Sequence, residues 1–208
     1  MKITREMAEK VRDVVAAGLS EGLGQAKPGF MCVEAAVCYA LGLPHGDDPG
    51  CVDPALRRLK IRLNDAAWPS KKARAAGLRR LAIAQLGSKG TIDTTTFVSR
   101  VTTVTIQTVV PVALRAAARL NPKHEQSLEA AALKCEQEPT IEFAHAAVDA
   151  ATAAAADAAA YAAGAAGAAA DAAHANILSE FAESVVQILI DLKAPGCEFL
   201  DLVPLEDC

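Results

Sequence analysis

A chain of 208 residues is long enough to bury a hydrophobic core without staples, so its six cysteines need not form the disulfide framework of a small secreted domain. Hydrophobic residues make up 52% of the chain but aromatic residues only 4%, and alanine is abundant. This composition predicts an all-α protein whose helices approach closely around small side chains. The N-terminal residues carry charges of both signs and no apolar run, so we expect no secretory signal there. The scattered cysteines favour a reducing, cytoplasmic setting.

The net charge of −4 conceals a strong partition along the chain. Residues 1–121 contain 18 Lys or Arg and 10 Asp or Glu, whereas residues 122–208 contain 3 and 15. We therefore expect two parts: a compact basic helical domain over 1–121, and an acidic, Ala-rich helical segment over 122–208 that carries a docked apolar tail. Their opposite charges favour docking of one part on the other, within a chain or between subunits.

Four helices are expected in the first 87 residues. Apolar residues recur at helical spacing over 3–23, and the run 31–41 is apolar on nearly all sides, which is typical of a buried helix. Asp53 can cap a third helix with Pro54 in its first position, where the missing N–H costs nothing. The turn at Trp68 leads into a fourth helix with its own apolar stripe.

Residues 92–120 are rich in Thr and Val, which favour strands, but their apolar positions also fit one face of a helix. Ile92 precedes Asp93, and Phe97 follows one turn later, as in a hydrophobic staple around a helix N-cap. We expect a helix with a kink near Pro111, because proline cannot donate the backbone hydrogen bond of a helix interior.

The remaining chain predicts a short helix from Asn121 to about Cys135, then a long Ala-rich helix or helical hairpin that begins near Pro139. Between residues 143 and 175, 22 of 33 residues are alanine, but three aspartates interrupt the run, so we expect no membrane span. The tail from Ala194 is too apolar to be a solvated terminus, and we expect it to dock on the body.

An alanine face gains little from burial unless another backbone comes close. The Ala-rich stretch therefore predicts close helix packing, against another copy in a homo-oligomer or against a protein partner. The candidate residues for self-association are Ala158, Ala162, Gly164, Ala165 and Gly167.

A second candidate site lies where the helix at 31–41 gives way to a Pro/Gly-rich loop. Cys32, His45 and Cys51 are potential ligands of a zinc ion, which needs about four such groups in a tetrahedral array. Their spacing contains no Cys-x-x-Cys pair, so we expect no cofactor and keep zinc as the alternative. The cysteines could instead be small core residues or form a Cys32–Cys51 disulfide, and the loop could be an ordinary turn stabilised by its aspartates.

Cys32 could also be a catalytic nucleophile, because the start of a helix lowers the pKa of a thiol. Gln25 lies seven residues upstream, which resembles the oxyanion-hole Gln of papain-like thiol hydrolases. No Gly-x-Cys-Trp motif is present, and the four histidines have no diagnostic spacing. We therefore favour a non-enzymatic protein and keep a cysteine-dependent enzyme as the alternative.

The segment 57–80 is strongly basic, with nine Lys or Arg and a single acid. It could contact phosphates of a nucleic acid or of a phosphorylated ligand, dock on the acidic half of the chain, or be a solvated face. The candidate residues for ligand or partner binding are Arg57, Arg58, Arg62, Trp68, Lys71, Lys72 and Arg74.

Within residues 25–90 the chain resembles a set of uncharacterised proteins from bacteria and their phages. The similarity rests on a Cys followed closely by Glu-Ala at Cys32, the loop Gly-x-Pro-x-x-Asp-x-Pro-x-Cys that ends at Cys51, and Leu-Asn-Asp at 63–65. It implies a phage or mobile-element setting and no activity. The sequence as a whole predicts a binding or assembly protein that acts through helix-mediated self-association or partner binding.

Overall fold

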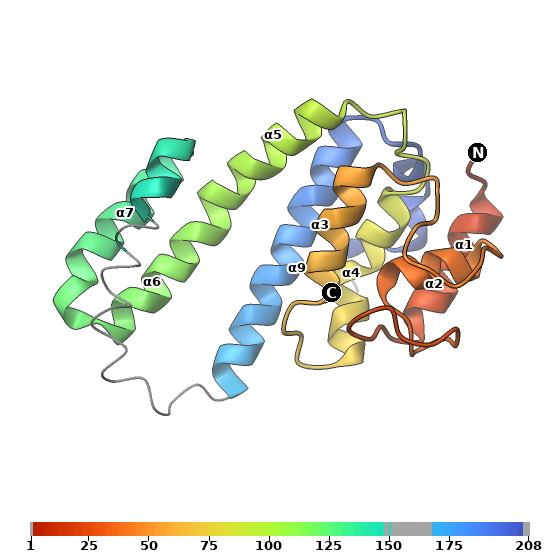
Figure 1. The fold of residues 1–208 in the computed structure, drawn as a ribbon, viewed down its shortest axis with the longest axis horizontal. Helices are drawn as coiled ribbons and strands as arrows, with labels where there is room; N and C mark the ends of the chain where they lie inside the picture. Colours follow the sequence, from red (N-terminus) through yellow and green to blue (C-terminus); the bar gives the residue numbers. More distant parts are fainter. Residues whose placement is uncertain (1, 148–149, 151–167, 206–208) are drawn as a thin grey trace. The chain divides into compact units, whose positions relative to one another are not determined.

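The computed structural model describes residues 2–147, 150 and 168–205. These residues form helices and no strand, apart from one isolated antiparallel bridge between Gly24 and Met31 (Figure 1). The predicted all-α class is therefore confirmed. The chain divides into two units: Met1–Val98 with Gly167–Cys208 (unit 1), and Ser99–Ala166 (unit 2). The boundary predicted at residue 121 falls inside unit 2, because the C-terminal helix joins the N-terminal helices rather than residues 122–147.

Unit 1 is built around α4 (Lys71–Ala84), against which most of the other helices of the unit pack. The residues of α4 from Leu81 to Ala84 are fully buried. The neighbours of α4 are α1 (Arg5–Ala16), α2 (Val33–Ala40), the C-terminal α9 (Ala168–Asp191) and the 3-10 helix η3 (Pro195–Leu202). The remaining helix, α3 (Pro54–Asn64), packs against α2.

Side-chain caps fix where these helices begin. Thr4, Asp53 and Ser70 each accept a hydrogen bond from a backbone N–H in the first turn of α1, α3 and α4, respectively. Pro54 is the first residue of α3, as the sequence predicts. The cap of α2 is less usual, since it is the thiol of Cys32.

The apolar tail lies against α4 and is held there by backbone groups and arginines. The N–H of Gly196 donates to the carbonyl of Leu86 at 2.8 Å. Arg79 and Arg80 donate to the carbonyls of Pro204 and Val203 at 3.2 and 2.6 Å. Arg80 also pairs with Glu183 of α9 at 2.9 Å, so one basic residue of α4 joins both C-terminal elements of the unit.

The helices α4 and α9 cross closely at Gly77. A Cβ atom at this position would overlap the ring of Trp68 and lie 2.7 Å from the hydroxyl of Ser179. Trp68 is itself buried, and its indole N–H donates to the carbonyl of Leu63 at 2.9 Å. Glycine is therefore needed for contact between the two helices and the indole ring.

Unit 2 contains most of a continuous helical run whose middle turn is irregular. The run consists of α5 (Thr94–Val104), a π-helical turn η1 (Thr105–Val109) and α6 (Val110–Leu120), so the helix predicted over 92–120 is confirmed. The N–H of Val110 donates to the carbonyl of Thr105, five residues back. Pro111 follows directly, and it has no N–H to donate to a carbonyl in the preceding turn. The wider π-helical turn accommodates this missing hydrogen bond.

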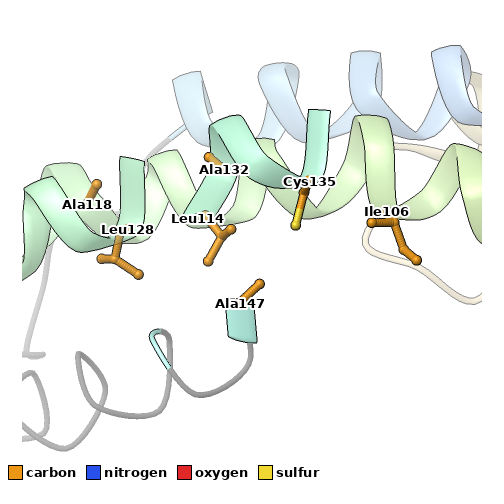
Figure 2. Packing of buried hydrophobic residues seen from close by; sticks show 7 residues of the cluster. All are labelled: Ile106, Leu114, Ala118, Leu128, Ala132, Cys135 and Ala147. Atoms are coloured by element: carbon orange, nitrogen blue, oxygen red, sulfur yellow. The ribbon is translucent and has the colours of Figure 1, made fainter. Parts of the chain in front are cut away.

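After the short 3-10 helix η2 (Pro122–His124), α7 (Glu125–Gln137) returns along α6, and residues 141–147 are again helical. A cluster of buried hydrophobic residues of unit 2 lies between these helices, as Figure 2 shows: Ile106, Leu114, Ala118, Leu128, Ala132, Cys135 and Ala147. Arg115 of α6 pairs with two glutamates of α7, with Glu129 at 3.3 Å and with Glu136 at 2.8 Å. Among the described residues this cluster is small, with three alanines among its seven members.

Candidate functional site

Cys32 lies at the start of α2, where the sequence predicts a helix that would activate a thiol. Its Sγ accepts a hydrogen bond from the N–H of Ala35 at 3.3 Å, and only 5% of the residue is exposed. Burial raises the pKa of the thiol, although the backbone N–H groups of Glu34 and Ala35 act to lower it. The predicted lowering of the pKa is therefore wrong, because the loss of solvation outweighs the helix start. Cys32 acts as a helix cap, and its geometry gives no support to a nucleophilic role.

The three candidate zinc ligands have different surroundings. Cys32 and Cys51 are buried and are free thiols, whereas His45 is exposed and its Nε2 lies 3.2 Å from the carbonyl oxygen of Gly24. Across the part of the chain that the structure describes, no group of three or more His, Cys, Asp or Glu side chains is placed to hold a metal ion. The structure therefore does not assemble Cys32, His45 and Cys51 into one site.

The loop that carries His45 is tied to α3 by charge. Arg57 pairs with Asp47 at 3.4 Å and with Asp48 at 3.2 Å. The other carboxylate oxygen of Asp48 accepts a hydrogen bond from the N–H of Gly50 at 3.0 Å, as in an Asx turn. These contacts correspond to the turn interpretation of the loop.

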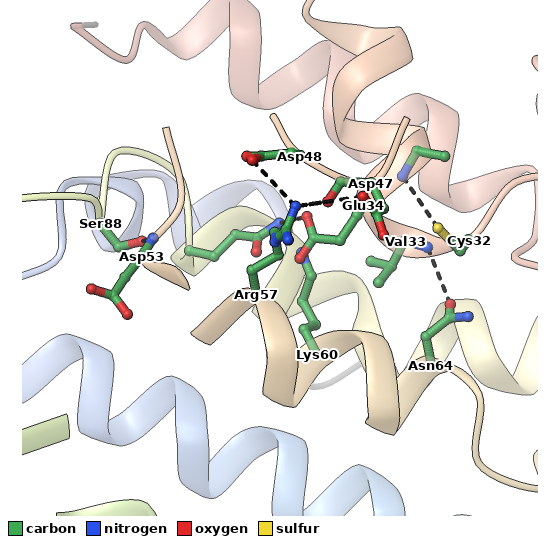
Figure 3. A network of polar contacts seen from close by, with 12 residues as sticks. Cys32, Val33, Glu34, Asp47, Asp48, Asp53, Arg57, Lys60, Asn64 and Ser88 are labelled. Carbon is green, nitrogen blue, oxygen red and sulfur yellow. Dashed lines mark hydrogen bonds and ion pairs between the residues drawn. The ribbon is translucent and has the colours of Figure 1, made fainter. Parts of the chain in front are cut away.

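The chemically most unusual feature of unit 1 is an ion pair that is closed off from solvent (Figure 3). The Nζ atom of Lys60, on α3, lies 3.3 Å from Oε1 of Glu34, on α2, and neither side chain is exposed. Gln85, just after α4, donates from Nε2 to Oε2 of Glu34 at 3.3 Å and is also buried. Three polar side chains from separate parts of the chain thus meet in the core.

Burial shifts both ionisable groups of this pair toward their neutral forms. It raises the pKa of Glu34 and lowers the pKa of Lys60, and in each case the attraction of the other group opposes the shift. Because the pKa of the carboxylate rises and the pKa of the lysine falls, the two pKa values approach each other, which favours proton exchange between the two groups. Neither side chain is exposed to solvent, so a substrate has no access to the pair.

A second set of polar contacts flanks the pair on α3. Asn64 accepts a hydrogen bond from the N–H of Val33 at 3.1 Å and donates to the carbonyl of Ser20 at 3.0 Å. Arg74 of α4 donates to the carbonyls of Asn64 and Leu19 at 2.7 and 3.2 Å. These bonds fix α2, α3 and α4 around the buried charges, so the arrangement serves to specify how the helices pack.

This pair was missed in the sequence, although two signals could have revealed it. Lys60 lies between Leu56 and Leu63 on the apolar stripe of its helix, and Glu34 lies within a run of apolar residues. A charged residue on the buried face of a helix requires a partner of opposite charge.

The predicted basic binding residues are separated by the fold into two groups. In the first group, Arg57 pairs with the aspartates of the loop, and Arg74 donates to backbone carbonyls. Trp68 is buried, and the Nζ atom of Lys71 lies 3.9 Å from the centre of the Phe30 ring. The exposed cations of the predicted set are Arg58, Arg62, Lys71 and Lys72, and Lys71 is the one that contacts the Phe30 ring. Much of the charge of 57–80 is thus engaged within the molecule.

The residues predicted for self-association, Ala158, Ala162, Gly164, Ala165 and Gly167, lie outside the described residues. No family model, no curated protein and no solved structure matches this chain. The resemblance to bacterial and phage proteins stays a prediction. The helices define the molecule as an all-α protein, and its core contains a buried ion pair.

Proposed function

We propose that the protein acts by binding rather than by catalysis, and that it assembles with a second copy of itself through the helix Thr94–Leu120. One observation carries this proposal. The helix has 27 residues and reaches a mean hydropathy of 1.4 over an 18-residue window, yet only 22% of that window is buried. A long apolar helix that is covered so little by the described part of its own chain has the character of an association surface.

The exposed apolar side chains of unit 2 support this assignment. Val112 and Leu120 of α6 are 38% and 76% exposed, and Leu133 and Ile141 are also exposed. The charge of Arg115 on the same helix is already balanced by Glu129 and Glu136. A second helix could therefore pack against this unit without burying that arginine unpaired.

By length and composition alone, the same helix could also cross a membrane. We favour a second copy over lipid because Arg100, Arg115 and Arg119 lie within the helix, and cations are costly in the hydrocarbon of a bilayer. The alanine and valine side chains of α6 also allow the close approach that helix pairing needs.

The cellular setting is part of the proposal. We place the assembly in a reducing cytoplasm, which agrees with the free thiols of Cys32, Cys38, Cys51, Cys135 and Cys197. The phage or mobile-element origin rests on the sequence pattern at 31–65 alone.

The particle mass of the native protein tests the proposal. Sedimentation equilibrium should give a multiple of the chain mass, and Val112→Lys with Leu120→Lys should shift the particle to monomer, because lysine cannot be buried unpaired. Leu43→Lys is the matched control, since this side chain is 37% exposed but lies in unit 1. A monomeric wild-type protein would contradict the proposal, as would incorporation of the wild-type protein into liposomes.

Enlarging the alanines tests the Ala-rich stretch separately. If it contributes to the assembly, Ala158→Leu, Ala162→Leu and Ala165→Leu should each weaken association, because overpacking pushes helices apart. Association unchanged in all three variants would restrict the interface to the helix Thr94–Leu120.

A further inference from the structure

Unit 1 contains a cavity of about 390 Å³ that is separate from the buried ion pair and from the association helix. It lies between α1, α4 and the tail, and its charged lining comes from Arg12, Lys72 and Arg79. None of the described residues that line it is acidic. A concave site whose described lining has three cations and no carboxylate has a positive potential.

The three cations differ in how firmly they are held. Arg12 pairs with the exposed Asp13 beside it at 2.8 Å, and Arg79 donates to the carbonyl of Pro204 at 3.2 Å. Lys72 is exposed in the first turn of α4. The two guanidinium groups are thus preorganised by neighbouring atoms, and the exposed lysine supplies an adjustable charge.

The rest of the lining is small and apolar. Ala16, Ala75 and Ala76 leave room beside the cations, and the described end of the tail forms the opposite wall. That wall is fixed, because Arg80 bonds the carbonyl of Val203 at 2.6 Å. The tail's docking on α4 therefore creates a defined space, rather than only covering the helix.

We propose that this cavity binds a small organic anion, with its phosphate or carboxylate group among Arg12, Lys72 and Arg79 and a short apolar body over the alanines. Its volume falls in the range of roughly 300–1,000 Å³ that is typical of small-molecule sites. Arginine forks suit both anions, since each oxyanion group can accept paired N–H bonds. The site belongs to unit 1, so it does not depend on the proposed self-association through the helix Thr94–Leu120.

Calorimetric titration of the full chain with phenyl phosphate and with benzoate tests the site. At least one of these anions should bind saturably with one molecule per chain, and the uncharged analogue phenol should not. The preferred anion distinguishes a phosphate from a carboxylate ligand. Lys72→Gln should raise the dissociation constant about fivefold, which corresponds to the loss of one partly exposed charge contact.

Arg62→Gln is the matched control, because it removes an exposed cation of α3 that does not line the cavity, and it should change binding less than about twofold. Ala16→Leu should abolish binding by filling the space, with an unchanged thermal melt to show that the fold is intact. The proposal is overturned if neither anion binds, if phenol binds equally well, or if Lys72→Gln and Arg62→Gln weaken binding to the same degree.

Discussion

The ammonium group of Lys60 and the carboxylate of Glu34 lie 3.3 Å apart with no exposure of either side chain to solvent. Removing one member leaves the other as an unpaired buried charge, so Glu34→Gln and Lys60→Met should each lower the free energy of unfolding by about 3–5 kcal/mol. Urea denaturation followed by circular dichroism measures this change.

Two further variants distinguish the effect of an unpaired buried charge from the effect of losing an ion pair as such. The double variant Glu34→Leu with Lys60→Met should recover most of the lost stability, because an apolar pair of similar volume often replaces a buried ion pair without net cost. Lys10→Met, which breaks the exposed pair of Lys10 with Glu6, should leave the unfolding midpoint unchanged. A double variant as unstable as the sum of the single variants would contradict this account.

The same pair should give the wild-type protein a minimum of stability between acid and alkaline pH. Because the pKa of Glu34 is raised in the folded state, its contribution is full below the ordinary value of 4.5 and is lost as pH rises through the folded pKa. Because the pKa of Lys60 is lowered, its contribution is full above 10.5 and is lost as pH falls through the folded pKa. The free energy of unfolding of the wild type, relative to that of the double apolar variant, should therefore be lowest between pH 4.5 and pH 10.5.

Urea midpoints measured for both proteins across this pH range provide the test. Subtracting the double variant removes the titration of all other groups. A difference that does not vary with pH would show that Glu34 and Lys60 titrate alike in the folded and unfolded states.

Gly77→Ala should destabilise unit 1 by about 1–3 kcal/mol, because the new methyl group would meet the ring of Trp68 and the hydroxyl of Ser179. Thermal melting together with tryptophan fluorescence measures the effect, since Trp68 is the only tryptophan. Gly46→Ala is the control, because the nearest atom to a Cβ there is the Pro44 carbonyl oxygen at 3.9 Å. Equal melting temperatures for the two variants would argue against a close crossing at Gly77.

Cys32 should behave as a helix cap and not as a reactive thiol. Cys32→Ser keeps an acceptor for the N–H of Ala35, whereas Cys32→Ala removes it, so the alanine variant should be less stable than the serine variant by about 1 kcal/mol. Iodoacetamide at neutral pH should modify Cys32 much more slowly in the native than in the unfolded protein, because burial raises its pKa. Rapid native labelling at Cys32 would reopen the enzymatic alternative.

Features decided within a few residues could be predicted from the sequence. The cap and proline at Asp53 and Pro54, and the choice of helix over strand near Phe97, depend on local spacing and local bonds. Features decided by distant residues could not. Arg80 and Glu183 meet across 103 positions, so nothing near either residue in the sequence identifies the other. The apolar neighbours of Lys60 and Glu34 indicate that each charge needs a partner, but they do not show that these two residues pair with each other.

The discontinuity of unit 1 has a consequence for synthesis of the chain. The helix α4 and its covering partner α9 are separated by the whole of unit 2. About a hundred residues lie between Leu81 and Val186, which takes a ribosome roughly 5–20 seconds to add. During that interval α9 does not yet exist to cover the apolar face of α4. Unit 2 therefore has time to fold first. Nascent chains truncated just before α9 should therefore require chaperones more than the finished protein does.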